Sequence, residues 1–464
     1  MLVAGTQKGL SNLTYDLVLK NGLLITSHEC FVADVGIIGE RIGAIGQVLS
    51  GAREIEARGL YVVPGAVDGH VHLTDPRYAP LYTPGADSFL VGTRAAAFGG
   101  VTSIVDFAAP KAGANLVEEL DQRIREAEGQ VVIDFTLNLT LRDCAPNRIH
   151  ELTEIFARGI TSIKLFMAYE GYQLDDLTIF RAMEVVAAHH GLAIVHAENF
   201  SIIKELERRL ATELGGNPRQ HLAARPASAE GDAVHRAIVL AQMSGAQLLL
   251  YHQTCEEGVR EIRLAKARGQ TVFGEVCIAQ LIYTSDDYLG SLERGFSLLT
   301  SPPIRERWHQ EALWQGLADG TLDLVSTDHG PRLRQPGQPG FGLSGIEARF
   351  ALVHHFGVQA GRISLSRWVD VCCTKPAEIF GLPRKGKLLP GYDADIVLFD
   401  PKQQVVFSHQ TLNSAIDYCT YAGITVTGYP VMTISRGEVI VSDGEFVGKH
   451  GRGMFIPRGS WQNQ

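Results

Sequence analysis

Five side chains of the kinds that bind metal ions stand at the ends of short apolar segments in this sequence. They are His70, His72, His196, His252 and Asp328. His70 and His72 are separated by one residue, so on a strand both would point the same way and could hold one ion. Each pattern alone is weak, because a surface strand produces His-x-His easily and a lone histidine after a strand is more often structural. Together they form a nitrogen and oxygen ligand set suited to zinc or a similar divalent ion.

A lysine completes this group. Lys164 lies in "ITSIKLFMAY", a segment that otherwise reads as a buried strand, and lysine is almost never fully buried unless it is paired. One interpretation is that its ammonium extends to the polar end of the strand and pairs with Asp328 or Glu275. The other is that a neutral amine beside two cations adds carbon dioxide. The product is a carbamate, an anionic group whose two oxygens can bridge two metal ions.

These six side chains can meet only if the fold brings the ends of several strands together. Eight short apolar runs occur between about residues 60 and 330, and the amphipathic segments between them often end in glycine, as helices do. Such alternation predicts a parallel sheet covered on both faces, and eight strands close a (β/α)8 TIM barrel of the α/β class. An open doubly wound sheet is the alternative, but no glycine-rich nucleotide-binding motif follows any run. In a barrel, the six side chains would gather at the carboxyl ends of the strands, where the active sites of barrel enzymes lie.

The two ends of the chain have a different pattern. Both alternate apolar and polar residues at a period of two, and the first carries hairpin signals at Asn21-Gly22 and Gly39-Glu40. A longer insertion after the fifth run, residues 198–232, is expected to form a helix and a loop over the barrel mouth. We predict a small β-sandwich from residues 1–65 and 384–450, a barrel from residues 66–383, and a C-terminal tail, 451–464, that becomes ordered only against a neighbour.

The composition excludes several classes of function. A net charge of −9, from 42 basic and 51 acidic residues, gives no positive surface for nucleic acid or acidic membranes. No run approaches the roughly 18 apolar residues of a membrane span, and the first residues lack the order of a signal peptide. Seven cysteines without zinc-finger spacing indicate reduced thiols. We therefore expect a cytoplasmic protein with no nucleic-acid and no membrane partner.

The chain resembles the amidohydrolase superfamily, in the branch that contains dihydropyrimidinases, hydantoinases and allantoinases. The motifs that carry the resemblance include "PGAVDGHVH", "SIKLFMAY", "IVHAEN", "RPASAEGDAVHRAI", "STDHGP" and "GYDADIVLFDP", and they cover nearly the whole chain. The resemblance implies two divalent metal ions, expected to be zinc, with manganese or cobalt as alternatives. It implies that the first is held by His70, His72, Lys164 and Asp328, and the second by Lys164, His196 and His252. It further implies a carbamylated Lys164 (N6-carboxylysine) and a homotetramer.

The resemblance also implies a mechanism. Two metals bridged by hydroxide supply a nucleophile at neutral pH and polarise a carbonyl oxygen. Attack on a cyclic amide gives a tetrahedral oxyanion, which one metal and the Tyr169 hydroxyl stabilise. Asp328 takes the proton of the hydroxide and hands it to the leaving nitrogen. Strict alternation would put Tyr169 on the face opposite Lys164, so we expect Tyr169 beyond the strand end, on a loop that turns inward. Ring recognition is expected at main-chain groups near Ser301 and at Phe341 and Gly342.

Departures from the family pattern bear on the substrate. Dihydroorotases place an arginine two residues after the second histidine, to hold a substrate carboxylate, and Thr74 stands there in this chain. The following "TDPRYAP" echoes the allantoinase pattern only in part, whereas "MAY" and "SPP" favour the hydantoinases. Phe341 replaces the usual asparagine, a change that a main-chain contact survives. Arg77, Tyr78 and Tyr82 either line a pocket for the ring substituent or form a solvated loop.

The sequence therefore predicts a binuclear metal hydrolase that opens a cyclic imide or ureide, such as a dihydropyrimidine or a 5-substituted hydantoin. Allantoinase is the alternative activity. A non-catalytic scaffold, like the dihydropyrimidinase-related proteins that lost their metals, is a further alternative, which the filled ligand positions disfavour.

Overall fold

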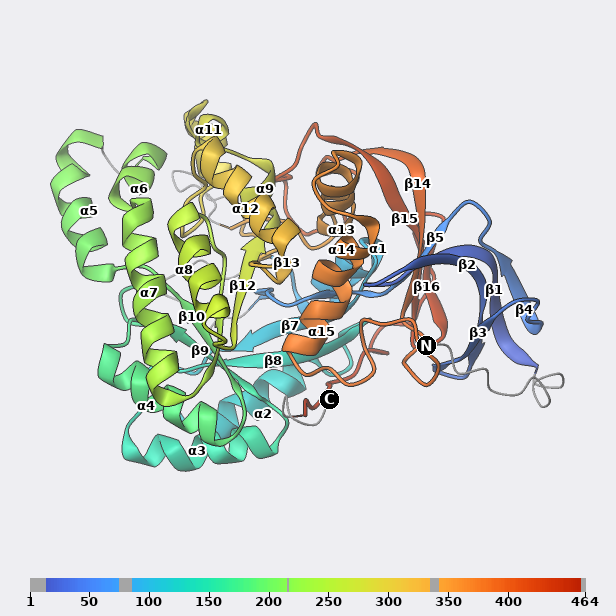
Figure 1. Ribbon diagram of the computed structural model, residues 1–464, viewed down its shortest axis with the longest axis horizontal. Coiled ribbons are helices and arrows are strands. Elements are labelled where there is room, and N and C mark those ends of the chain that lie inside the picture. The colour runs from blue at the N-terminus through green and yellow to red at the C-terminus, as the bar shows by residue number, and fades with distance from the viewer. Residues whose placement is uncertain (1–13, 75–85, 215–216, 334–341, 460–464) are drawn as a thin grey trace.

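The computed structural model describes residues 14–74, 86–214, 217–333 and 342–459. An α/β barrel lies beside a β domain to which both ends of the chain contribute (Figure 1). No helix in these described ranges is both long and apolar enough to cross a membrane.

The barrel contains eight parallel strands in sequence order. They are β6 (Ala66–Asp68), β7 (Val101–Ala108), β8 (Asp134–Thr140), β9 (Ser162–Phe166), β10 (Leu192–His196), β11 (Gln247–Leu250), β12 (Val272–Cys277) and β13 (Leu324–Ser326). A parallel bridge between Val71 and His329 joins the chain just beyond the first strand to that just beyond the last. The predicted TIM barrel is thus confirmed, and the open doubly wound sheet is excluded.

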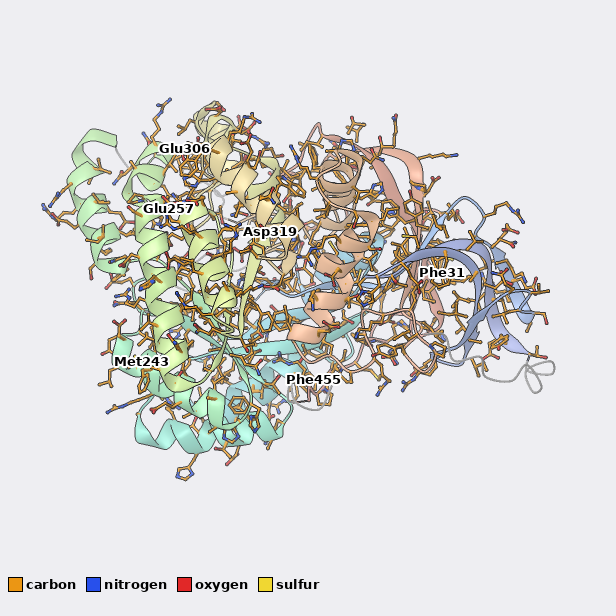
Figure 2. The ribbon with its side chains drawn as sticks, viewed as in Figure 1. Phe31, Met243, Glu257, Glu306, Asp319 and Phe455 are labelled. Atoms are coloured by element: carbon orange, nitrogen blue, oxygen red, sulfur yellow. The ribbon has the colours of Figure 1, made fainter. Side chains whose placement is uncertain are left out.

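Helices cover the outside of the barrel (Figure 1). The main ones are α1 (Phe89–Phe98), α2 (Leu116–Ala127), α3 (Pro146–Ala157), α4 (Asp176–Ala188), α7 (Ala227–Ser244), α8 (Glu256–Ala267) and α12 (Arg307–Asp319). The side chains of Asn115 and Asp175 cap the first turns of α2 and α4, and Gly245 ends α7 at a φ of 73°. Charged side chains such as Glu306 and Asp319 lie on the outer side of this layer (Figure 2).

The remaining helices lie in the loops and in the last unit. After β10 come α5 (Phe200–Leu214) and α6 (Pro218–Ala224), where one helix and a loop were expected, and after β12 come α9 (Ile278–Ile282), α10 (Ser285–Leu289) and α11 (Leu292–Ser297). After β13 the chain forms α13 (Arg349–Val353), the π-helix η2 (His354–Gln359), α14 (Leu365–Val369), the π-helix η3 (Asp370–Thr374) and α15 (Lys375–Ile379).

The β domain is one nine-stranded sheet. Its strands are β1 (Tyr15–Ile25), β2 (Cys30–Ile38), β3 (Arg41–Gly46), β4 (Gly51–Glu56), β5 (Tyr61–Pro64), β14 (Ile396–Val406), β15 (Thr425–Ser435), β16 (Glu438–Ser442) and β17 (Glu445–Phe446). Val63 on β5 pairs with Val397 on β14, which joins the two ends of the chain. The sheet curls over its own apolar core until the β2–β3 turn meets the β15–β16 turn, where Arg436 Nη1 lies 2.7 Å from Glu40 Oε1.

The two predicted hairpins had different outcomes. Gly39-Glu40 does form the turn between β2 and β3, as expected. The prediction at Asn21-Gly22 is wrong, because β1 runs straight through it with an irregularity in its pairing between Leu19 and Gly22. Asn21 has a φ of 59°, and its N–H donates to Asp34 Oδ1 at 2.8 Å. Asparagine tolerates this left-handed conformation, which a bulge needs as much as a hairpin does.

A buried ion cluster fastens the barrel to the β domain. Lys385 Nζ lies 2.7 Å from both Asp134, at the start of β8, and Asp395, just before β14. Arg436 Nε lies 3.2 Å from Asp134 on its other oxygen. Because all these groups are almost fully buried, their charges are compensated within the cluster rather than by water.

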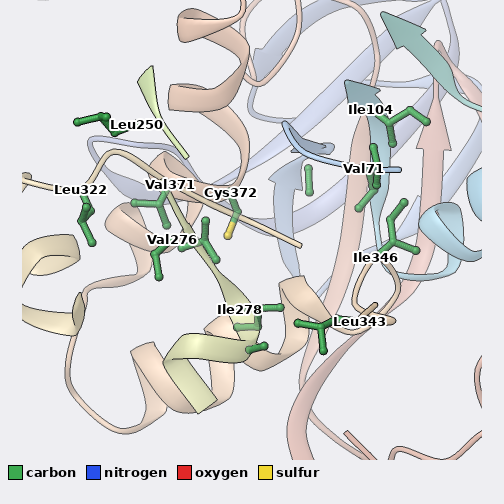
Figure 3. Close-up of a cluster of buried hydrophobic side chains, with 14 of the residues drawn as sticks. Val71, Ile104, Leu250, Val276, Ile278, Leu322, Leu343, Ile346, Val371 and Cys372 are labelled. Carbon is green, nitrogen blue, oxygen red and sulfur yellow. The ribbon is translucent and has the colours of Figure 1, made fainter. Parts of the chain in front are cut away.

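Alternate residues of each barrel strand face two different cores. On β7, Ile104 packs in the outer core between strands and helices, and Val105 packs inside the barrel. The outer core also contains the residues around Val276 and Ile278 that Figure 3 shows. On β9, Ile163 and Leu165 face this outer core. The alternation of a strand therefore points Ser162, Lys164 and Phe166 into the barrel.

Candidate metal centre

Three of the predicted ligands meet where the first and last barrel strands end. His70 and His72 follow β6, and Asp328 follows β13. The Nε2 atoms of the two histidines are 3.1 Å apart, and each lies 3.1 Å from Asp328 Oδ1. Asp328 has a φ of 50°, a left-handed conformation that is uncommon outside glycine and typical of functional sites. Two imidazole nitrogens and a carboxylate oxygen that converge in this way can hold one divalent ion.

Two further histidines form a second group. His196 ends β10, and His252 follows β11 with a φ of 40°. His196 Nδ1 lies 2.9 Å from His252 Nε2, so these two atoms face the same point. The ring of His252 also lies 5.7 Å from that of His70, which places the two groups of histidines side by side.

Lys164 lies on β9, next to the strand β10 that ends in His196, and it is 1% exposed. Its Nζ has no hydrogen-bond partner in the described parts of the chain. The interpretation in which the Lys164 ammonium pairs with Asp328 or Glu275 is therefore not observed. Instead, Nζ lies 4.1 Å from the centre of the Tyr251 ring. Burial outweighs the attraction of Glu275 and Asp328 and lowers the pKa of Lys164 from 10.5 to about 7.

Buried carboxylates orient the histidines. Glu275 Oε2 on β12 lies 3.1 Å from His70 Nδ1 and accepts the His252 N–H at 2.8 Å. Glu198 Oε2 lies 2.8 Å from His196 Nε2. Each contact holds the proton on the nitrogen that faces the carboxylate and leaves the other nitrogen as a ligand. Sequence reasoning missed both roles, although a glutamate within the apolar run "TVFGEVC" was a signal for Glu275.

The charges of the site suit metal binding. Burial lowers the pKa of His72, His196 and His252, so the rings are neutral at neutral pH, which is the form that coordinates metals. Burial alone would raise the pKa of Asp328, but His70, His72 and Lys164 outweigh it and hold that pKa below its usual range. Asp328 is therefore ionised and available as a ligand or proton acceptor.

A cavity of about 400 Å³ opens above these groups, and all six predicted ligands line it. Part of its wall comes from Ile203 on α5, His221 on α6 and Arg225 just after α6, none of which the sequence had indicated. Arg225 Nη1 lies 3.0 Å from Glu207 on the same wall, and His221 Nε2 lies 2.9 Å from the Thr300 carbonyl oxygen. The six predicted ligands thus lie at the floor of an open cavity that is large enough for a small ring compound.

Tyr169 lies where the sequence predicts. It stands beyond the end of β9, at a φ of 80°, on a turn that points its ring toward His196, with the ring centres 4.7 Å apart. Its hydroxyl donates to the Ser301 carbonyl oxygen at 3.4 Å. The Tyr169 hydroxyl and the Ser301 main chain therefore lie together at the cavity wall.

The other predicted contacts are only partly described. Gly342 lines the cavity at a φ of 116°, and a Cβ there would lie 2.0 Å from the Gly330 carbonyl oxygen, so only glycine fits. Its carbonyl oxygen accepts the Tyr418 hydroxyl at 3.0 Å. Phe341 lies outside the described residues, as do Arg77, Tyr78 and Tyr82.

Comparisons with known proteins agree with this geometry. The sequence profile of the Amidohydrolase family matches residues 61–440. The D-hydantoinase of Streptomyces coelicolor is 39% identical and that of Geobacillus stearothermophilus 37%, over 96% of this chain and 98% and 97% of theirs. The crystal structure of dihydropyrimidinase from Brevibacillus agri superposes with a TM-score of 0.92 at 36% identity, over 96% of this chain and 98% of that one. The chain therefore belongs to the amidohydrolase family, in the branch of the dihydropyrimidinases and hydantoinases.

Proposed function

We propose that this protein uses two divalent metal ions to hydrolyse a C–N bond of a cyclic amide, opening the ring of a dihydropyrimidine or a 5-substituted hydantoin. One observation carries the proposal: six side chains with metal-binding chemistry converge on the floor of one cavity of about 400 Å³. The relatives named D-hydantoinase and dihydropyrimidinase, which match over nearly the whole chain, support this reaction class.

The residues fit a pair of divalent ions. His70, His72 and Asp328 would hold the first, and His196 and His252 the second. Burial keeps the imidazoles of His72, His196 and His252 neutral and Asp328 is ionised, so these groups need no proton removed before they bind a metal. Glu275 and Glu198 already fix the tautomers of His70 and His196. When bound, two such ions supply a water molecule of lowered pKa and polarise a carbonyl oxygen. Zinc suits this nitrogen and oxygen set, as would manganese or cobalt.

Lys164 would complete the centre as a carbamate. Its amine nitrogen would form a bond to the carbon of carbon dioxide and release one proton, which leaves an anion with two oxygens for the two ions. The observation in favour is the buried Nζ without a hydrogen-bond partner. The pKa of about 7 leaves much of the amine neutral, which is the form that reacts.

Two residues would act on the substrate. The Tyr169 hydroxyl, whose hydrogen bond to Ser301 is long at 3.4 Å, can donate instead to the oxygen of the attacked carbonyl. Asp328 Oδ1 can accept a proton and carry it to the leaving nitrogen. Main-chain groups at Ser301 and Gly342 on the cavity wall would hold the ring.

The site does not reproduce the arginine that holds a substrate carboxylate in dihydroorotases. At the position where dihydroorotases have an arginine, the Thr74 hydroxyl donates to the Asp87 carbonyl oxygen at 2.9 Å. A threonine so placed supplies no cation for a substrate carboxylate. Allantoin is also neutral, so allantoinase stays the alternative that an assay must separate.

We further propose a cytoplasmic homotetramer. Some apolar side chains on the outer helices are exposed, such as Leu177 on α4 at 57% and Met243 on α7 at 68%. Burial of such residues between copies would stabilise an assembly. All seven cysteines are free thiols, as in a reducing compartment. Light scattering after size-exclusion chromatography measures the oligomeric state, and a monomer would contradict the assembly.

The decisive experiment combines metal analysis with a substrate panel. Protein purified without chelators is expected to contain about two equivalents of zinc, manganese or cobalt. It is then assayed with dihydrouracil, hydantoin, an aryl-hydantoin and allantoin. Less than one equivalent of metal would refute the hydrolase and favour a scaffold, and turnover of allantoin alone would replace the proposed substrate class.

A further inference from the structure

The C-terminal segment is part of the barrel. Residues 451–459 were expected to order only against a neighbour, but they lie against the chain's own strand β8. The Phe135 N–H donates to the Met454 carbonyl oxygen at 2.9 Å, and the Ile456 N–H donates to the Phe135 carbonyl oxygen at 2.7 Å. Phe455 packs on Phe135 with the ring centres 5.6 Å apart, below the barrel strands (Figure 2). This segment therefore adds one parallel β-bridge, between Phe135 and Phe455, at the amino-terminal end of the barrel.

The segment ends by closing that end of the barrel. Ile456 packs against the apolar cluster inside the barrel, and Pro457 lies against Gly159, where a Cβ would come within 2.6 Å of the Pro457 side chain. The Arg458 N–H then donates to the Gly159 carbonyl oxygen at 2.8 Å. Arg458 is 5% exposed. A guanidinium thus enters the barrel from the end opposite the metal centre.

The contacts of Arg458 are unusual for a buried cation. Nη1 donates to the Ser162 hydroxyl at 2.8 Å, and Nη2 donates to the Leu137 carbonyl oxygen. Both acceptors are uncharged. Burial lowers the pKa of Arg458 to about 9, so the guanidinium is still protonated at neutral pH. Burying a cation without a counter-charge is unfavourable, so an uncharged side chain would fill this space at a lower cost. We therefore expect the charge of Arg458 to have a function other than filling space.

A chain of hydrogen bonds leads from Arg458 through the barrel interior. The Ser162 hydroxyl donates to the Asn138 Oδ1. Asn138 Nδ2 donates to the Tyr251 hydroxyl at 3.0 Å, and that hydroxyl donates to the Gly69 carbonyl oxygen at 2.8 Å. Arg458 Nη1, the Ser162 hydroxyl, Asn138 Nδ2 and the Tyr251 hydroxyl each donate to the next group in the chain. The arginine at one end therefore sets the direction of the bonds that follow.

The chain ends directly beneath the metal centre. The Tyr251 ring stacks on the His70 ring with the centres 3.9 Å apart. Lys164 Nζ lies 4.1 Å from the centre of the Tyr251 ring. Gly69, which receives the last hydrogen bond, is the neighbour of His70, and Tyr251 is the neighbour of His252. A shift of the Tyr251 ring would therefore move three of the side chains that hold the metals.

We propose that Arg458 is a positioning residue for the metal centre, acting through Ser162, Asn138 and Tyr251 to hold His70 and Lys164 in place. The inference rests on the proposed function, because it assigns the buried arginine a task only where metals bind. Since residues behind the ligands tune metal affinity by 10- to 100-fold, we expect an effect of about tenfold for loss of this more distant group.

The test compares metal binding by four variants and the wild-type protein. Arg458→Met removes the cation, Arg458→Lys restores it, and Tyr251→Phe removes only the hydroxyl and keeps the ring. Arg452→Met is the matched control, because Arg452 lies in the same segment but contacts Glu438 and the Ser435 carbonyl oxygen of the β domain. Each apoprotein is loaded with Co²⁺ for its visible absorption spectrum, titrated against a competing chelator, and melted without metal.

We expect Arg458→Met and Tyr251→Phe to alter the Co²⁺ spectrum and weaken affinity about tenfold, Arg458→Lys to recover part of the loss, and Arg452→Met to match the wild type. A wild-type spectrum and affinity in Arg458→Met, with only a lower melting temperature, would overturn the positioning role. If Arg458→Met does not fold, an unchanged Tyr251→Phe overturns it equally. Failure of the wild-type protein to bind one equivalent of Co²⁺ would instead overturn the proposed metal centre.

Discussion

Replacing Lys164 by methionine should stabilise the metal-free protein while abolishing the metal centre. Methionine has nearly the length of lysine and carries no charge, so it suits the apolar surroundings of β9. In the apoprotein the lysine ammonium is buried without a hydrogen-bond partner. Its removal therefore relieves an unfavourable burial rather than breaking a favourable contact.

The magnitude follows from the pKa of Lys164. It falls from 10.5 to about 7 on folding, and each pKa unit corresponds to about 1.4 kcal/mol. Below pH 7 both states carry the charge and the full penalty applies. Between pH 7 and 10.5 the folded state is neutral while the unfolded state is still protonated, so the penalty shrinks as the pH rises. The advantage of Lys164→Met should be at most about 4 kcal/mol at pH 7 and about 2 kcal/mol at pH 9.

The assay is urea unfolding of both apoproteins at pH 7 and pH 9, with a chelator and without bicarbonate. Lys385→Met is a matched control, because Lys385 is also buried but lies 2.7 Å from Asp134 and Asp395. Its loss leaves carboxylates unpaired and should destabilise the fold by about 3–5 kcal/mol. A Lys164→Met apoprotein less stable than wild type, or an advantage that does not shrink toward pH 9, would refute the reasoning.

Three further predictions test the site and its surroundings. Glu275→Gln should weaken metal affinity 10- to 100-fold, measured by chelator competition, because His70 loses its carboxylate partner; unchanged affinity would contradict that role. Tyr169→Phe should lower kcat by about 100-fold and leave metal content intact, because only the donor to the oxyanion is lost; loss of metal instead would indicate a structural role. Burial raises the pKa of the Glu347 carboxyl from 4.5 to about 7. Below pH 4.5 the carboxyl is protonated in both the folded and the unfolded state. As the pH rises from 4.5 to 7, the stability that the protonated carboxyl contributes to the folded state is lost. Glu347→Gln should therefore match wild type in chemical denaturation at pH 4 and exceed it at pH 8, and equal differences at both pH values would speak against it.

The local sequence pattern predicted where a residue lies only when pairing with a distant strand did not decide its conformation. Strand alternation placed Lys164 inside the barrel and Tyr169 beyond the end of β9, because both follow from a strand period of two. The same kind of rule failed at Asn21-Gly22. A left-handed asparagine serves a hairpin and a bulge equally, and the pairing of β1 with β2 decides between them. The tail prediction failed at Arg458 for a similar reason, since nothing local shows which strand a short terminal segment will join.

The sequence by itself determined the architecture of this protein and identified the side chains that could bind a metal ion. The period of its apolar residues requires parallel strands alternating with helices, and chemistry confines histidines and an aspartate at strand ends to few uses. Only the tertiary structure decided how these groups are supported. Glu275 contacts His70 from another strand, and the hydrogen-bond chain to Tyr251 begins with Arg458 and Ser162, which are 296 positions apart. Such contacts depend on the packing of distant strands into one barrel, which no local pattern encodes.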